Sequence, residues 1–106
     1  MKVEQAARQL EALGNSTRLR IYRALVRAGE AGLPVGRLQQ KLGIAASTLS
    51  HHLHRLIMTE LVTQERQGTT LICRANYPAM NSLLGYLVDE CCIDAACAET
   101  RSETAA

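Results

Sequence analysis

Residues 36–58 read GRLQQKLGIAASTLSHHLHRLIM, a stretch in which one glycine separates two segments of helical character. The first segment, at about residues 36–42, predicts a short helix that ends at Gly43, because glycine readily adopts the left-handed conformation that closes a helix. A short helix, a tight turn and a second helix are typical of a helix-turn-helix. The apolar residues of the second segment recur at helical spacing and share one face: Leu49, Leu53, Leu56 and Ile57.

The next segment indicates a β-hairpin. Residues 61–65 and 70–75 favour strands, and they flank the turn-forming RQGT at residues 66–69. A hairpin directly after a helix-turn-helix forms the wing of a winged helix-turn-helix. The sequence therefore predicts a mainly α fold with a small β-hairpin, preceded by an extended LPV at residues 33–35 because the residue before proline avoids the helical region.

Further helices are predicted on both sides of this unit. The first covers residues 3–13 and ends at Gly14, and the second begins after Asn15, a good N-cap residue. A domain of this size does not cover its terminal helices by itself, so we expect two copies to associate. The inward positions of the second helix are expected at Leu19, Tyr22, Leu25 and Val26. A last helix from Pro78 carries an apolar stripe of Met80, Leu83, Leu84, Leu87, Val88 and Cys91.

Charge is distributed unevenly along the chain. Residues 1–88 carry eleven Lys and Arg against five Asp and Glu, whereas residues 89–106 carry one against five. A basic body indicates an anionic partner, and three tyrosines without Phe or Trp disfavour stacking on single-stranded bases. No stretch has the length of a membrane span or the character of a signal peptide, so we expect a cytoplasmic protein without a membrane partner, with reduced thiols.

The second helix of the helix-turn-helix presents hydroxyl, imidazole and guanidinium groups on the faces that leucines leave unoccupied. Short hydroxyls at a helix N-terminus can approach phosphates and base edges, and residues at a hairpin tip can reach the flanking backbone or minor groove. A solvated polar face would look similar, but the basic body favours double-stranded DNA. No catalytic constellation is apparent, so we expect no enzyme. The candidate DNA-binding residues are Ser47, Thr48, Ser50, His51, His54, Arg55, Arg66 and Gln67.

Three stretches together resemble the ArsR/SmtB family of metal-responsive repressors: ALGNSTRLRIYRALVRAG at residues 12–29, STLSHHLHRL at 47–56 and ELVTQERQGTTLICRANY at 60–77. The resemblance covers about residues 4–92. It implies a homodimeric winged-helix repressor that dimerises through its first and last helices. Such a repressor binds an inverted-repeat operator and leaves it when an inducer binds.

Sensor sites vary within this family, so each residue must be matched by itself. GRLQQKLG lacks the CxC pair of one branch, and the last helix lacks the histidines of the zinc-sensing branch. Thiolates without imidazole favour soft thiophilic ions. The arrangement of Cys91, Cys92 and Cys97 resembles the branch that binds arsenite or antimonite at the C-terminal end of the last helix, and it implies control of arsenic-resistance genes with no organic cofactor.

Two alternatives remain open at this point. A methylarsenite-selective branch pairs a strand cysteine with a vicinal pair, which would make Cys73 the third ligand instead of Cys97. A repressor of the same fold that responds to thiol oxidation or persulfides shares every feature except the ligand. We place the DNA-binding and dimerisation domain at residues 1–93 and a flexible tail with Cys97 at residues 94–106.

Overall fold

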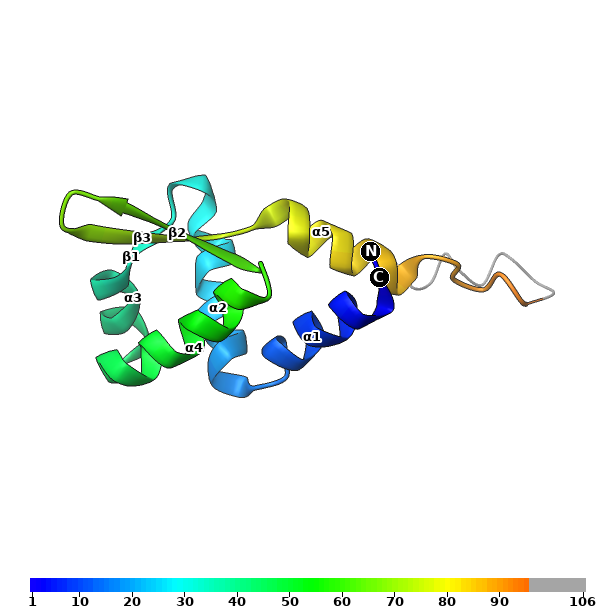
Figure 1. Cartoon of the computed structure of the whole chain (residues 1–106), viewed down its shortest axis with the longest axis horizontal. Helices are drawn as coiled ribbons and strands as arrows, with labels where there is room; N and C mark the ends of the chain where they lie inside the picture. The colour runs from blue at the N-terminus through cyan, green and yellow to red at the C-terminus, as the bar shows by residue number, and fades with distance from the viewer. Residues whose placement is uncertain (96–106) are drawn as a thin grey trace.

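The computed structural model describes residues 1–95. In Figure 1, α2, α3, α4 and the sheet form a head, while α1 and α5 lie beside each other and extend from it. No helix within residues 1–95 has the length and apolar character needed to cross a bilayer. The elements in chain order are α1 (Val3–Leu13), α2 (Ser16–Ala28), the short 3-10 helix η1 (Gly29–Ala31), β1 (Leu33–Pro34), α3 (Val35–Leu42), α4 (Ala46–Met58), β2 (Val62–Gln67), β3 (Thr70–Ala75) and α5 (Tyr77–Val88).

The predicted helix-turn-helix is confirmed as α3 and α4. Gly43 closes α3 with φ 66° and ψ 35°, the left-handed conformation expected of it. Asn15 caps α2 as predicted, because its side chain accepts a hydrogen bond from the backbone N–H of Arg18 at 3.0 Å. The head is held together by fully buried side chains from α2, α3, α4 and the loop after α4: Ile21, Leu25, Leu38, Leu49, Leu56 and Leu61.

The predicted hairpin is confirmed as β2 and β3, and β1 adds a third antiparallel strand in the order β1-β3-β2. Leu33 pairs with Cys73, and Pro34 pairs with Ile72. The segment before β1 must pass close to β3, since a Cβ on Gly32 would lie 2.5 Å from the Cys73 carbonyl oxygen. Gly32 also has φ 71°, so glycine is required there for both reasons. The sequence predicted the extended segment but not its pairing with the wing.

One inward position on α2 was predicted wrongly. Leu19 is 42% exposed, whereas Arg18 is only 9% exposed and Ile21 is fully buried. The buried stripe of α2 runs through Arg18, Ile21, Tyr22 and Leu25, which have the i, i+3, i+4, i+7 spacing of one helix face. A reading that follows apolar residues alone cannot include a buried arginine, and it therefore selects Leu19 in its place.

The last helix is shorter than its apolar stripe predicted. Helix α5 ends at Val88, and Asp89 already has an extended backbone with ψ 139°. Tight turns follow, in which Glu90 and Cys92 both have φ 62°. Cys91 therefore lies beyond the helix and does not continue its stripe.

Apolar side chains on α1 and α5 remain exposed to solvent in the single chain. Leu10 on α1 is 42% exposed, and Leu84 and Leu87 on α5 are 52% and 54% exposed. Val3 and Val88 are exposed by more than half and extend the same faces. We name this set (Val3, Leu10, Leu84, Leu87 and Val88) the terminal-helix face.

Candidate functional site

The N-terminal half of α4 presents a row of short polar side chains to solvent. Ala45 precedes the helix and provides no side-chain cap, so the first N–H groups of α4 point outward without a side-chain acceptor from the cap residue. Backbone N–H groups at a helix N-terminus attract phosphate oxygens. Five of the predicted DNA-binding residues are exposed here: Ser47, Thr48, Ser50, His51 and His54.

The sixth predicted residue of α4, Arg55, is partly buried and engaged. Its Nη2 atom lies 3.6 Å from a carboxylate oxygen of Glu11 on α1. The Glu11 side chain is 74% exposed, so this ion pair is weak and screened by solvent.

The wing carries polar and charged residues at its tip and an ion pair further along its strands. Arg66 and Gln67 are exposed at the end of β2, where they pair with Leu71 and Thr70, and Gly68 forms the turn with φ 64°. On β3, the Arg74 guanidinium donates to a Glu65 carboxylate oxygen at 2.6 Å and lowers the pKa of that carboxyl. Arg74 also donates through Nε to the Glu30 carbonyl oxygen at 2.8 Å, which ties the wing to η1.

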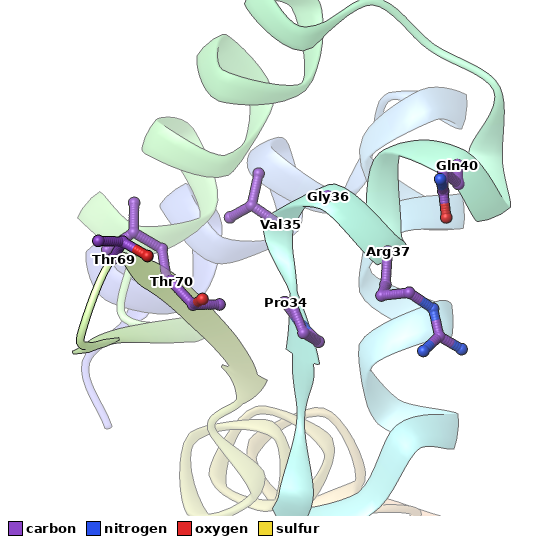
Figure 2. A pocket seen from close by; sticks show the side chains of 8 residues that line it. Pro34, Val35, Gly36, Arg37, Gln40, Thr69 and Thr70 are labelled. Atoms are coloured by element: carbon purple, nitrogen blue, oxygen red, sulfur yellow. The ribbon is translucent and has the colours of Figure 1, made fainter.

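A groove of about 530 Å³ separates the wing from the beginning of α3. Figure 2 shows Thr69 and Thr70 on the wing side, Arg37 and Gln40 on the α3 side, and Pro34 with Val35 between them. The polar part of the lining consists of hydroxyl, amide and guanidinium groups without a carboxylate, and Pro34, Val35 and Leu71 form its apolar part. Its chemistry therefore matches a phosphodiester backbone.

The sequence did not identify Arg18 and His52, which link α2 to α4. Arg18 on α2 donates through Nε to the Ala12 carbonyl oxygen at 2.6 Å, and its Nη1 atom lies 3.3 Å from Nδ1 of His52 on α4. His52 has a lowered pKa, because burial and then the charges of Arg18, His51 and Arg55 disfavour its protonated form. The available signal was the spacing of Arg18, which stands three residues before Ile21 on the buried stripe.

The vicinal thiols lie in the turns after α5. The Sγ atoms of Cys91 and Cys92 are 3.5 Å apart, and both residues are partly exposed. Successive residues of a helix would point about 100° apart, and the left-handed backbone at Cys92 brings the two sulfurs together instead. Cys97 lies outside the described residues.

Cys73 occupies a different part of the molecule. It is fully buried in β3, accepts a hydrogen bond from Gln64 Nε2 at 3.4 Å, and has a thiol pKa raised by burial. Within residues 1–95, no three Cys, His, Asp or Glu side chains come together as a metal site. A single chain in this conformation therefore does not bring Cys73 to the vicinal pair.

Comparison with known proteins agrees with this architecture. Residues 13–65, from the end of α1 to the middle of β2, match a helix-turn-helix domain family. Nodulation protein NolR of Rhizobium meliloti is 37% identical over 86 residues, which are 81% of this chain and 68% of that protein. An ArsR-like transcriptional regulator from Rhodococcus sp. RHA1 has a TM-score of 0.70 at 25% identity, over 79% of this chain and 76% of the other. The chain belongs to the ArsR/SmtB family of transcriptional regulators.

Two more structures of similar proteins are described by their state of assembly or their redox state. The homodimeric winged helix-turn-helix DNA-binding domain of Mb0332 from Mycobacterium bovis, described as a possible ArsR-family transcriptional regulator, has a TM-score of 0.66 at 27% identity, over 83% of this chain and 82% of that one. Reduced HlyU from Vibrio cholerae has a TM-score of 0.63 at 30% identity, over 81% of this chain and 90% of that one. As an ArsR/SmtB member, this chain is a winged helix-turn-helix transcriptional regulator.

Proposed function

We propose that the protein is a homodimeric repressor that leaves its operator DNA when trivalent arsenic or antimony binds its cysteines. The observation that carries the choice of inducer is the 3.5 Å separation of the Cys91 and Cys92 sulfurs. Two sulfurs in contact can act together as ligands of one thiophilic ion, and trivalent arsenic and antimony bind thiolates in this way.

The DNA-binding half of the proposal rests on α4, the wing and the groove between the wing and α3. Serine and threonine hydroxyls and imidazoles line the exposed face of α4, and Arg66, Gln67 and Arg37 flank it. We assign α4 to the major groove, the wing tip to the flanking backbone or minor groove, and the groove beside α3 to a backbone phosphate. These roles make α4 the recognition helix.

The dimer rests on the terminal-helix face. Its five side chains are between 42% and 66% exposed in the single chain. They belong to α1 and α5, the two helices that extend from the head (Figure 1), and an exposed apolar surface of this kind marks an interaction site. The homodimeric state of the Mb0332 domain supports the same assembly here. Two heads related by a twofold axis would read two half-sites of an inverted repeat.

The ligand set begins with Cys91 and Cys92. Arsenite and antimonite take three sulfurs, and Cys97 is our choice of third ligand because only four residues separate it from Cys92. Methylarsenite needs two thiolates, so Cys91 and Cys92 alone can hold it. Cys73 as an alternative third ligand requires a thiol from the partner subunit to approach it, or a large rearrangement of one chain, because Cys73 lies in β3 and the vicinal pair follows the far end of α5 (Figure 1).

The vicinal thiols lie next to α5, and this position can couple ligand binding to DNA binding. Ligand binding fixes the turns directly after α5, α5 contacts α1, and α1 contacts α4. A change at the end of α5 is thereby passed to the relative placement of the two recognition helices. An inducer needs a coupling free energy of about 1–3 kcal/mol to act as a switch of ordinary strength.

The test is release of a fluorescent operator fragment, chosen by selection from random duplexes, followed by anisotropy of the reduced protein. We expect arsenite, methylarsenite or antimonite to release DNA at low stoichiometry, with zinc inert. Cys92→Ser should bind DNA as the wild type does and fail to release it. Cys73→Ala distinguishes the two third ligands, because it should still respond when Cys97 completes the set and lose its response to arsenite when Cys73 does. Loss of DNA binding by Cys92→Ser, or release by zinc alone, would overturn the assignment.

A redox-responsive repressor is the second candidate. The Sγ atoms of Cys91 and Cys92 are 3.5 Å apart. Oxidation of this pair would close the strained ring of a vicinal disulfide, with two electrons passing to an oxidant such as a peroxide or polysulfide and two protons released. One similar structure is described as reduced HlyU, and a protein with a distinct reduced form supports this alternative. Release by a polysulfide but by none of the arsenicals would select it.

A further inference from the structure

Three polar links connect α1 to α4 at different positions along α4. Gln9 donates through Nε2 to the Thr59 carbonyl oxygen at the end of α4, at 2.9 Å. Glu11 pairs with Arg55 at 3.6 Å. The third link runs from the Ala12 carbonyl oxygen through the Arg18 guanidinium to His52.

The third link depends on the protonation state of His52. A guanidinium has donors only, so Nδ1 of His52 must be the acceptor in the 3.3 Å contact with Arg18. Such an imidazole is neutral and carries its proton on Nε2. Protonation places an N–H on Nδ1, which cannot accept, and sets a second positive charge against Arg18.

Among residues 1–95, the charged groups that act on His52 are all cationic or imidazole and do not compensate for that charge. Arg18 faces it from α2, and His51 and Arg55 face it from α4, with the His51 ring centroid 5.6 Å away. The carboxylate that approaches from α1 belongs to Glu11, and it pairs with Arg55. Protonated His52 would therefore leave the link instead of forming a new one in place.

We propose that Arg18 is a positioning residue for the recognition helix and holds α4 in register with α1 only while His52 is neutral. The inference rests on the proposed DNA binding, because register between α1 and α4 sets how two heads meet two half-sites. Neutral His52 favours the operator-binding arrangement. Acidification breaks the link and weakens operator binding beyond any effect on the residues that touch DNA.

The test compares the wild type with two His52 variants, since His52 is partly exposed and its replacement spares the buried Arg18. His52→Asn keeps an acceptor, Oδ1, near the position of Nδ1 at every pH, and His52→Leu has no acceptor at any pH. At pH 7.5 we expect the wild type to bind the operator like His52→Asn, and His52→Leu to bind roughly tenfold more weakly. As the pH falls to 5, the wild type should move toward His52→Leu.

Ratios of operator affinity between these proteins isolate His52, because His51 and His54 are present in all three. A wild-type to His52→Asn ratio that stays constant from pH 7.5 to 5 would overturn the proposal, as would equal binding by His52→Leu and His52→Asn. Two-bond ¹H–¹⁵N spectra of the unbound protein give an independent readout, with the proton expected on Nε2. Failure of the wild type to bind any duplex would refute the proposed function itself. A proton on Nδ1 of His52 in the unbound protein would refute only this inference.

Discussion

Replacing Leu87 with aspartate tests the dimer and its role in DNA binding. Leu87 is 54% exposed in the single chain, and burying a whole leucine contributes about 1.5–3 kcal/mol. Covering the exposed half therefore contributes roughly 1 kcal/mol per subunit, or about 2 kcal/mol for a twofold dimer. An aspartate loses this contribution and adds the cost of removing a carboxylate from water.

The apolar loss alone corresponds to a dimer dissociation constant raised about thirtyfold, at 1.4 kcal/mol per factor of ten, and the carboxylate raises it further. Sedimentation velocity across a concentration series measures it directly, and anisotropy reports the accompanying loss of operator binding. Leu19→Asp is the matched control, because Leu19 is 42% exposed on α2, outside the terminal-helix face, and should leave both properties unchanged. A dimer dissociation constant of Leu87→Asp equal to that of the wild type would refute the assignment of this face.

Three further predictions concern the head. Gly32→Ala should lower the free energy of unfolding by more than about 2 kcal/mol in urea titrations, since its Cβ meets the Cys73 carbonyl oxygen at 2.5 Å and its φ is 71°; an unchanged midpoint would contradict this reading. Glu60→Gly should raise the free energy of unfolding by about 1 kcal/mol in the same titrations, because Glu60 directly follows Thr59, the C-cap of α4, and has φ 68°, and a lower midpoint would count against it. Glu65 has a pKa below the usual 4.5 owing first to its hydrogen bond with Arg74, so its contribution to stability is complete above pH 4.5 and is lost as the pH falls through the folded value. Glu65→Gln should remove that part of the acid dependence, as NMR titration and unfolding at stepped pH would show; the same acid dependence in wild type and variant would exclude the pair as its source.

The sequence was sufficient to predict the helix-turn-helix and the wing because their signals are local. Gly43 and Asn15 fix a helix end and a helix start through backbone conformation and capping, and the spacing of Leu49, Leu53 and Leu56 gives the buried face of α4. These residues act within one or two turns of their own position. Their structural roles therefore survive in any packing of the chain.

The residues that link elements could not be predicted in the same way. Burial of Arg18 depends on the Ala12 carbonyl at the end of another helix and on His52, which is 34 residues away in the chain. No glycine or proline follows Val88 to indicate that α5 ends there, and the positive φ values occur at Glu90 and Cys92. The vicinal thiols were recognised as a pair, but their convergence arises from this backbone and not from their spacing.

The order of strands in the small sheet also limits how copies of the chain can meet. The order β1-β3-β2 places β1 and β2 at the edges. β1 has two residues and ends at Pro34, which lacks an N–H, and β2 carries Glu65 and Arg66 on exposed positions. Short, proline-ended or charged edges resist the addition of a foreign strand. The wing is thereby protected against edge-to-edge aggregation, and self-association is left to surfaces made of helices.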